Sequence, residues 1–455
     1  MKRLLTAGTH SGCGKTTVTC GLLAALKERG LRVSAFKCGP DYIDPMFHRE
    51  VTGIPSYNLD SFFCDDDMLR YLLHENAAGS DIAVIEGVMG YYDGVNGRGS
   101  AYSVAVLTDT PAVLIIDCTG MSDSIGAVLR GFIGYRSPDS IAGVIFNKLP
   151  ERLLPLAERL CGELGTRCFG YFPKSSVTIE SRHLGLVTAA EIDGIRGKLR
   201  TLGELAEKCI DIDALLQLPE REIPAYKTPV FQPVSDPKPV IAVARDRAFC
   251  FIYADNVELL KKLGCEIRYF SPVTDRKLPE NAAGLILCGG YPELYAAELS
   301  ANTEMQADIK AKIMSGMPVI AECGGFMYLH DSFGDMEGGV FRGVRAIRGR
   351  AYLTEKLQRF GYVTLTAKKD GLLCSAGESF PAHEFHRFDS TDCGCDMTAV
   401  KADGRSWDCV HMTDSVYAGF PHLYFYADIG IARRFADKCR EYMEKKNGDK
   451  SVSAG

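Results

Sequence analysis

The residues Gly8-Thr9-His10-Ser11-Gly12-Cys13-Gly14-Lys15-Thr16-Thr17 decide the fold of the first half of the chain. The apolar run LLTAG at residues 4–8 leads into them, and an amphipathic pattern from Val18 to Arg29 follows. A glycine-rich turn between a buried strand and a helix lets backbone N–H groups surround a phosphate at the helix N-terminus. The lysine then neutralises the β- and γ-phosphates, and the next hydroxyl binds Mg²⁺. The stretch therefore predicts a nucleotide-binding α/β domain, with a loop one residue longer than the usual P-loop.

The ends of two other predicted strands indicate where a metal ion and a base would bind. The run DIAVIEG at residues 81–87 ends in Glu86, where P-loop proteins usually carry a metal-binding aspartate. We expect Glu86 to hold Mg²⁺ directly or through water; the alternative is a solvated carboxylate at a strand end. The run GVIFN at residues 143–147 ends in Asn147, whose amide would pair with an adenine edge or only cap a turn.

A lysine and three aspartates are expected at the same edge of this sheet. The segment FKCGPDYIDP at residues 36–45 places Lys37, Asp41 and Asp44 at the carboxyl end of the second strand, and Asp93 lies in a later glycine-rich loop. Ligands bind at that edge in open α/β sheets. A lysine and carboxylates beside a nucleotide suit metal binding and substrate positioning, whereas the alternative for the segment is a capped turn.

Composition and charge exclude several classes of protein. The 455 residues are 46% hydrophobic, and 52 basic against 58 acidic side chains give a net charge of −6, which argues against a binder of nucleic-acid phosphates. No apolar run reaches the roughly 18 residues of a membrane span, and the N-terminus lacks the apolar core of a signal peptide, so we expect a cytoplasmic protein. The 17 cysteines include no C-x-x-C pair. Most are expected to be small buried hydrophobes, and Cys393 and Cys395 form only half of a zinc site.

A proline-rich segment divides the chain into two halves. LPEREIPAYKTPVFQPVSDPKPV at residues 218–240 carries six prolines, which exclude a regular helix and indicate an extended linker. Each half alternates continuous apolar runs with helical patterns, which is typical of βαβ units and a parallel sheet. We expect two α/β domains with three-layer architecture, a β-rich addition at about residues 334–404 and a disordered tail. The predicted parts of the chain are a first domain at residues 1–217, the linker at 218–240, a second domain at 241–445 and the disordered tail at 446–455.

The second half contains one cysteine in the setting of a nucleophile. The apolar strand MPVIAE runs into Cys323, and Gly324, Gly325 and a helical pattern follow at once. Such an elbow exposes the side chain at the top of the sheet and sets the sulfur near a helix N-terminus, which favours the thiolate. The N–H groups of Gly324 and of Gly290, in the loop after the strand GLIL, are the expected oxyanion donors.

The base should come later in the chain. His422, in AGFPHLY, follows a short strand near the C-terminus and would accept the thiol proton. His383 and His386, in PAHEFHRF, compete for this role but lack the spacing of a metal-binding pair.

Taken together, these residues resemble the cobyrinic acid a,c-diamide synthase family along essentially the whole chain. The first half is also similar to dethiobiotin synthetase, which has the same lengthened P-loop, and the C-terminal half resembles a flavodoxin-like class I glutamine amidotransferase domain. Such amidotransferases usually carry Gly two residues before the nucleophile and Glu two residues after the histidine; here the residues are Ala321 and Tyr424. The cobyrinate branch also lacks that glutamate. The resemblance is carried by GTHSGCGKTT, FKCGPDYIDP, NLDSF (58–62), VIEGVMGYYDG, RHLGL (182–186), AVARDRAFCFIYADN, CGGYPE, AECGGFMYL and HEFH.

The resemblance implies ATP- and Mg²⁺-dependent amidation of the a and c acetate carboxylates of cobyrinic acid, with glutamine as nitrogen donor, in cobalamin biosynthesis. Cys323 and His422 would hydrolyse glutamine, and an acyl phosphate would form at the ATP site. The other implied roles are ATP binding by Gly12, Gly14, Lys15, Thr16, Thr17 and Asn147; metal binding by Thr16, Glu86 and Asp44; substrate binding by Lys37 and Tyr42; and a place near the reacting carboxylate for Asp41, Asp44 and Asp93.

Alternatives remain at this point. The same scaffold could act on hydrogenobyrinate or nickel-sirohydrochlorin. Cobyric acid synthase shares both domains but has a different residue set around the phosphate site, and PDYIDP and the RHLGL region argue against CTP synthase. A partitioning ATPase would carry lysine five residues before Lys15, where this chain has His10. The expected partner is a small-molecule corrinoid, with no nucleic acid and no membrane, and a homodimer is left open.

Overall fold

The computed structural model describes residues 1–175, 177 and 189–453, which form two compact units, Met1–Pro229 and Val230–Gly455. The RHLGL motif at residues 182–186 lies outside the described residues. The boundary between the units falls inside the proline-rich segment, which has no helix or strand from Pro219 to Pro239. Each end of the segment is bound to its own unit, because Arg3 donates to the Arg221 carbonyl (2.6 Å) and the Val234 N–H to that of Leu263 (2.8 Å).

The first unit is built on a seven-stranded, wholly parallel sheet with the order β3-β2-β4-β1-β5-β6-β7. Its strands are β1 (Lys2–Gly8), β2 (Val33–Cys38), β3 (Ser56–Leu59), β4 (Ile82–Glu86), β5 (Ala112–Asp117), β6 (Ile141–Asn147) and β7 (Cys168–Phe172). Its helices are α1 (Lys15–Glu28), α2 (Ile43–Phe47), α3 (Asp66–Asn76), α4 (Ala101–Leu107), α5 (Ser124–Phe132), α6 (Leu154–Glu163), α7 (Ala189–Cys209) and α8 (Ile212–Leu216), with a π-helical turn at His48–Thr52 and a 3₁₀ turn at Glu151–Leu153.

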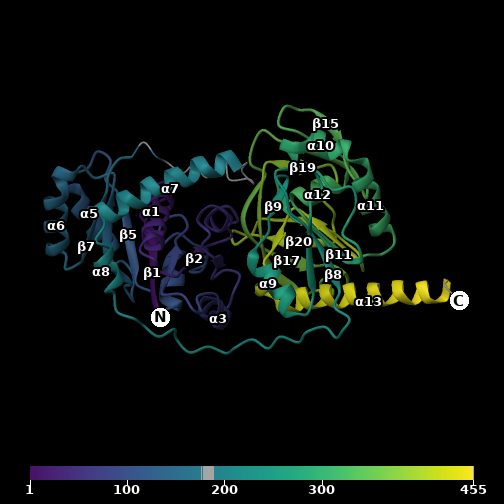
Figure 1. Ribbon diagram of the computed structural model, residues 1–455, viewed down its shortest axis with the longest axis horizontal. Coiled ribbons are helices and arrows are strands. Elements are labelled where there is room, and N and C mark those ends of the chain that lie inside the picture. The colour runs from purple at the N-terminus through teal and green to yellow at the C-terminus, as the bar shows by residue number, and fades with distance from the viewer. Residues whose placement is uncertain (176, 178–188, 454–455) are drawn as a thin grey trace. The chain divides into compact units, whose positions relative to one another are not determined.

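Helices α1 and α7 lie side by side over one face of this sheet (Figure 1). Their backbones approach so closely that a Cβ on Gly21 would lie 2.9 Å from the Leu202 carbonyl oxygen. Leu22 and Leu26 of α1 pack with Leu202 of α7 on the apolar side chains of the strands. This packing fixes the start of α1, and with it the glycine loop, at the carboxyl edge of the sheet.

The second unit has a six-stranded sheet with the order β10-β8-β11-β13-β23-β22, parallel except for β22. These strands are β8 (Val240–Ala244), β10 (Glu266–Phe270), β11 (Ala282–Leu287), β13 (Val319–Glu322), β22 (His411–Met412) and β23 (Val416–Gly419). The helices are α9 (Ala254–Lys262), α10 (Ala296–Ala301), α11 (Thr303–Met314), α12 (Gly324–Leu329) and α13 (Ile429–Ser453), with 3₁₀ turns at Pro292–Tyr295 and Phe425–Ala427.

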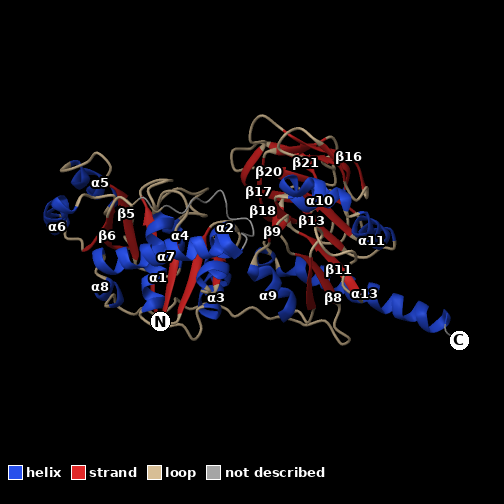
Figure 2. Cartoon of the chain, turned by 45° about the horizontal axis from the view of Figure 1, so that its top comes forward, coloured by secondary structure: helices blue, strands red, loops and turns tan. Residues whose placement is uncertain are grey.

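The predicted β-rich addition is confirmed as two further antiparallel-rich sheets, ordered β15-β14-β16-β19 and β21-β20-β17-β18-β24. Figure 2 shows most of these strands gathered away from α9 and α13. A small pair, β9 (Phe249–Phe251) with β12 (Gly289–Gly290), closes the loop after β11. The remaining bounds are β14 (His330–Gly334), β15 (Val340–Arg342), β16 (Ile347–Leu353), β17 (Arg359–Ala367), β18 (Ser379–His386), β19 (Phe388–Ser390), β20 (Met397–Val400), β21 (Ser406–Cys409) and β24 (His422–Leu423).

The C-terminal tail differs from the sequence-based expectation. Helix α13 continues through residues 446–453 of the segment expected to be disordered. The run EYMEKK at residues 441–446, which leads into this segment, consists largely of strong helix formers, and an ion pair between Arg440 and Glu444 (3.3 Å) spans one helical turn.

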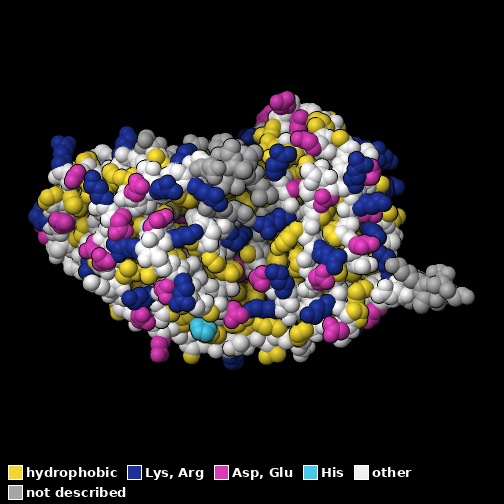
Figure 3. Space-filling view, in the orientation of Figure 1, with side chains coloured by type: hydrophobic (Ala, Val, Ile, Leu, Met, Phe, Trp, Pro, Cys, Tyr) yellow, Lys and Arg dark blue, Asp and Glu magenta, His cyan; other side chains and the backbone are white. Residues whose placement is uncertain are grey.

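The apolar character of the helices and the distribution of surface charge both bear on what the sequence led us to expect. None of the helices in the described part of the chain is both long and apolar enough to cross a membrane. On the face drawn in Figure 3, Lys and Arg side chains are interspersed with Asp and Glu in both units.

Candidate functional site

The glycine loop has the backbone geometry of an anion-binding turn. Gly12 and Gly14 have φ of 82° and 92°, which favours glycine, and Gly14 caps the N-terminus of α1. The amide of Asn147 donates to the Cys13 carbonyl (2.8 Å), and a Cβ on Gly14 would lie 2.1 Å from the nitrogen of that amide. Asn147 therefore braces the loop from β6, which the sequence did not indicate; its contact with adenine stays a prediction. Thr17 lies in the first turn of α1.

Lys15 points back over the loop. Its Nζ donates to the His10 carbonyl (3.1 Å), and the side chain is largely buried. Burial lowers its pKa, and the nearby Lys37 acts in the same direction, while Glu86 and Asp93 oppose the shift. A cation held in this way loses less solvation when it meets a phosphate than an exposed lysine would.

Behind the loop, Thr16 and Lys37 converge on one carboxylate. The Thr16 hydroxyl donates to Glu86 Oε1 (2.6 Å), and Lys37 Nζ lies 2.8 Å from the same oxygen. Lys37 also pairs with Asp44 at 2.5 Å. Burial alone would lower the pKa of Lys37, but its carboxylate neighbours raise it well above the ordinary value, so the lysine is charged.

The oxygen atoms of this cluster fit a magnesium ion. Glu86 Oε2 is buried with no hydrogen-bond partner, and burial raises the pKa of Glu86 to about 7. The Asp44 carboxylate lies near enough to Glu86 to raise the pKa of Glu86 further. A divalent cation would offset the repulsion between the two carboxylates, and Thr16, Glu86 and Asp44 together supply the hard oxygen donors that Mg²⁺ prefers.

The two other predicted aspartates lie at the rim of this cluster. The Asp41 carboxylate accepts from the N–H of Ile43 (2.8 Å) at the start of α2, and burial together with Asp44 raises its pKa to about 6. Asp93 accepts from the N–H of Gly90 (2.9 Å) and lies near enough to Lys15 to influence it. Tyr42 is the residue before α2 and is half-buried.

His48 joins the cluster without having been predicted. It is fully buried, with Nε2 3.9 Å from Glu86 Oε2 and 3.7 Å from the sulfur of Cys20. Burial lowers the pKa of His48 to about 4, so the imidazole is neutral. No spacing in the sequence pointed to it, because it lies in the irregular turn after α2.

In the second unit, Cys323 forms a strained elbow between β13 and α12. Its φ of 46° and ψ of −103° are rare for a residue with a side chain, and such strain is concentrated at functional sites. A Cβ on Gly325 would lie 2.0 Å from the Leu287 carbonyl oxygen, so only glycine permits this turn. The N–H of Gly290 lies 3.2 Å from the position that a Cβ on Gly324 would take, which brings together the two predicted oxyanion donors.

His422, at the start of β24, meets Cys323 from the neighbouring sheet. The two side chains are hydrogen-bonded, and His422 Nδ1 lies 3.4 Å from Glu322 Oε2. Burial alone would lower the pKa of His422, but the neighbouring Cys323 and Glu322 raise it to about 10. The imidazole is therefore a strong base for the thiol proton. Sequence reasoning missed Glu322, although an acid ending an apolar strand directly before the nucleophile was a visible signal.

The competing histidines have other contacts. His386 pairs with Glu384 (2.9 Å) and stacks on Phe420, with ring centroids 4.0 Å apart. His383 lies opposite His422 across the β18–β24 pair, and burial together with the charge of His422 lowers its pKa to about 3.

The pair Cys393 and Cys395 has no metal-binding surroundings. Cys393 donates to Asp389 (3.3 Å). Within the described residues, no group of three or more His, Cys, Asp or Glu side chains could hold a metal ion, and the magnesium site considered at Thr16 has only two such side chains, Glu86 and Asp44.

Two family models and several known relatives match this chain along most of its length. Residues 4–186 match the CobQ/CobB/MinD/ParA nucleotide binding domain, and residues 240–429 match the CobB/CobQ-like glutamine amidotransferase domain. A cobyrinate a,c-diamide synthase of Caldanaerobacter subterraneus subsp. tengcongensis is 38% identical over 96% of this chain and 98% of its own length. The chain belongs to the cobyrinate a,c-diamide synthase family. Other members are those of Clostridium acetobutylicum (38% identical; 95% of this chain, 99% of the relative) and Priestia megaterium (35%; 98% of both).

Membership in this family confirms the predicted architecture, an N-terminal P-loop domain joined to a C-terminal amidotransferase domain. The chain is thus an enzyme of the synthase class that carries a glutamine amidotransferase domain.

Proposed function

We propose that this enzyme amidates the a and c acetate carboxylates of cobyrinic acid, using glutamine as nitrogen donor and ATP as activating co-substrate. The observation that carries the proposal is the presence of two built sites in a chain that aligns from end to end with cobyrinate a,c-diamide synthases. One is a phosphate-binding loop backed by Lys37 and Glu86, and the other is the hydrogen-bonded pair of Cys323 and His422.

In the second unit, the Cys323 thiolate, whose proton already resides on His422, attacks the side-chain amide of glutamine. The N–H groups of Gly290 and Gly324 stabilise the tetrahedral oxyanion, and His422 returns the proton to the departing ammonia. Water then hydrolyses the thioester to glutamate. The raised pKa of His422 supports this part of the mechanism, because it favours a thiolate–imidazolium pair before substrate arrives.

In the first unit, the loop with Gly12, Gly14 and Lys15 binds the phosphates of ATP. Mg²⁺, held by Thr16, Glu86 and Asp44, would neutralise phosphate charge there. The buried cation of Lys37 orients the γ-phosphate and the incoming carboxylate, which becomes an acyl phosphate and so a good acyl donor. Ammonia displaces phosphate, and the sequence is repeated at the second acetate.

The remaining assignments follow from position. Asp41 and Asp93 flank the reacting carboxylate, and the pKa of about 6 for Asp41 suits proton uptake from ammonia. Tyr42 contacts the macrocycle and Asn147 the adenine edge. We propose two catalytic domains, residues 1–217 and 241–445, which are joined by the linker 218–240. We also propose that the enzyme acts in the cytoplasm.

The test is turnover by the purified full chain with ATP, Mg²⁺, glutamine and cobyrinic acid, with the corrinoid followed by mass spectrometry. We expect two amide groups per macrocycle and one ATP consumed per amide. Hydrogenobyrinate and nickel-sirohydrochlorin are assayed in parallel. Amidation of one of these, with cobyrinic acid left unchanged, would retain the chemistry and refute the proposed substrate.

A further inference from the structure

The glutaminase site lacks the acid that usually follows its histidine. Tyr424 occupies the position two residues after His422, where class I amidotransferases usually carry glutamate. Tyr424 is buried and packs edge-on against the ring of Tyr253, with centroids 4.9 Å apart. An imidazole that receives a proton still needs a partner for its other nitrogen, because that partner fixes the tautomer and stabilises the charge.

Glu322 supplies a carboxylate at the required place. Its Oε2 lies 3.4 Å from His422 Nδ1, and its Oε1 accepts from the backbone N–H of Leu423 (3.1 Å). The side chains of Glu322 and His422 are only 9% and 3% exposed, so water screens their interaction weakly. The elbow at Cys323 explains how two adjacent residues reach one imidazole, because the chain leaves the strand geometry between them.

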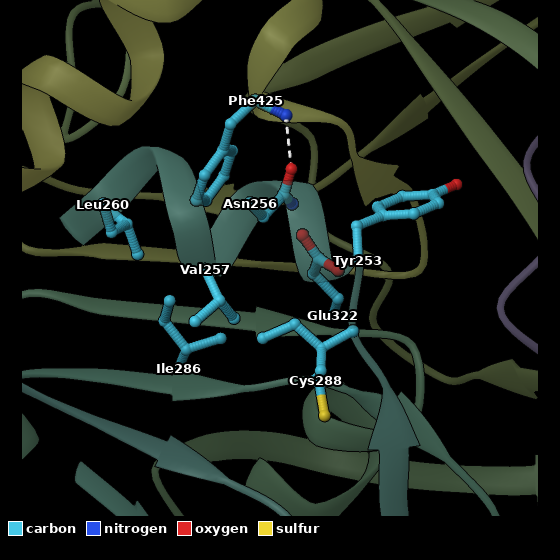
Figure 4. A pocket seen from close by; sticks show the side chains of 9 residues that line it. Tyr253, Asn256, Val257, Leu260, Ile286, Cys288, Glu322 and Phe425 are labelled. Carbon is cyan, nitrogen blue, oxygen red and sulfur yellow. Dashed lines mark hydrogen bonds between the residues drawn. The ribbon is translucent and has the colours of Figure 1, made fainter. Parts of the chain in front are cut away.

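The surroundings hold this carboxylate in position. Figure 4 shows Glu322 pointing toward helix α9, where Asn256 binds the same segment of chain. The Asn256 side chain donates to the Leu423 carbonyl (2.8 Å) and accepts from the Phe425 N–H (2.8 Å). The titratable groups that face Glu322 and His422 are Cys323 itself, Tyr253 directly before α9, Cys288 after β11, Tyr417 on β23 and His383 on β18.

We propose that Glu322 is the positioning residue of the glutaminase site, replacing the glutamate found after the histidine in related amidotransferases. Its Oε2, 3.4 Å from His422 Nδ1, pairs with a proton on that nitrogen, which leaves Nε2 to take the proton of the Cys323 thiol. The imidazolium formed is then paired with the Glu322 carboxylate, and the proton moves on to ammonia when the C–N bond of glutamine breaks. This inference rests on the proposed glutaminase function of the second unit.

The test compares three variants of the full chain. Glu322→Gln replaces the acceptor by an amide that favours the wrong tautomer, and a change of this kind in a catalytic triad lowers kcat by about 10⁴-fold. We therefore expect glutamine hydrolysis to fall about 10²- to 10⁴-fold and Glu322→Asp to restore part of it. Asn256→Ala is the matched control, because it releases the same backbone segment while leaving the carboxylate in place.

The decisive readout is the pH dependence of Cys323 alkylation by iodoacetamide, followed on its own peptide by mass spectrometry because the chain has 17 cysteines. Loss of the carboxylate should move the midpoint to higher pH, since the imidazolium that favours the thiolate is no longer paired. Asn256→Ala should leave the midpoint unchanged. Equal shifts in Glu322→Gln and Asn256→Ala, or none in Glu322→Gln, would overturn the proposal. Glutamine hydrolysis without corrinoid amidation by the unaltered enzyme would refute the proposed substrate alone.

Discussion

Replacement of Gly289 by alanine tests the geometry of the glutaminase site with a single methyl group. A Cβ at this position would lie 2.6 Å from His422 Cε1 and 3.5 Å from the Cβ of Cys323. Carbon atoms in contact are normally about 3.5–4.0 Å apart, so the imidazole must move by about 1 Å. The backbone has little freedom to compensate, because Gly289 pairs with Phe251 in the β9–β12 ladder.

A displacement of about 1 Å from the productive geometry can cost about 100-fold in rate, which corresponds to about 2.7 kcal/mol of transition-state stabilisation. We expect glutamine-dependent turnover of Gly289→Ala to fall by about this factor. Turnover with ammonium salts bypasses Cys323 and should change by less than about twofold. Added bulk in a packed site also costs about 1–3 kcal/mol of stability, so the melting temperature should fall modestly.

The assay measures phosphate release and corrinoid amidation with glutamine and with ammonium in the same preparation. Gly334→Ala is the matched control, because a Cβ on this buried strand glycine would lie 3.6 Å or more from its neighbours. Full glutamine-dependent activity in Gly289→Ala would refute the placement of His422 against Cys323. Equal losses with both nitrogen donors would mean that the substitution acts through the fold as a whole.

The other predictions concern each site in turn. Cys323→Ser should abolish glutamine-dependent amidation and keep ammonium-dependent amidation, because only the first needs the thiol; loss of both would contradict separate sites. Glu86→Gln should lower turnover with either nitrogen donor at least about 100-fold and weaken the thermal stabilisation by Mg²⁺–ATP, since a carboxylate in contact with Thr16 and Lys37 is lost; an unchanged melting shift would argue against the metal assignment. Gly14→Ala should prevent ATP binding, because its Cβ would overlap the Asn147 amide at 2.1 Å; calorimetry would show this directly. The pKa of His422 is raised from 6.5 to about 10 despite its burial, through Cys323 and Glu322, so the stabilisation it provides is complete below pH 6.5 and is lost as the pH rises through 10. The melting temperature of the unaltered enzyme should therefore fall more between pH 7 and 10 than that of His422→Gln, and parallel curves would contradict this.

Sequence patterns predicted the architecture well where strands are buried. The apolar runs that became β1, β2, β4, β6, β11 and β13 are typical of parallel strands covered on both faces. The strand β3 was missed because its four residues include the polar Ser56 and Asn58, and β7 because Gly170 interrupts its apolar run with a φ of 106°. These segments form strands because they pack against neighbouring elements, and a linear sequence pattern does not show that packing.

The sites show the same division between local and tertiary information. The glycine loop and the Cys323 elbow could be predicted because each is a continuous stretch whose backbone geometry demands its residues. His48, the bracing role of Asn147 and the contact between Glu322 and His422 could not, because they join segments far apart in the chain. Glu322 shows the difference clearly, since its partner comes much later in the chain and only the packing of β24 beside β13 brings the two together.

Transfer of nitrogen from glutamine to the corrinoid tests the account most directly. The purified enzyme is given ATP, Mg²⁺, cobyrinic acid and glutamine labelled with ¹⁵N in its side-chain amide. The account predicts a product with two ¹⁵N-labelled amide groups, and none with Cys323→Ser. A corrinoid that carries no label, or labelled amides formed by Cys323→Ser, would contradict it.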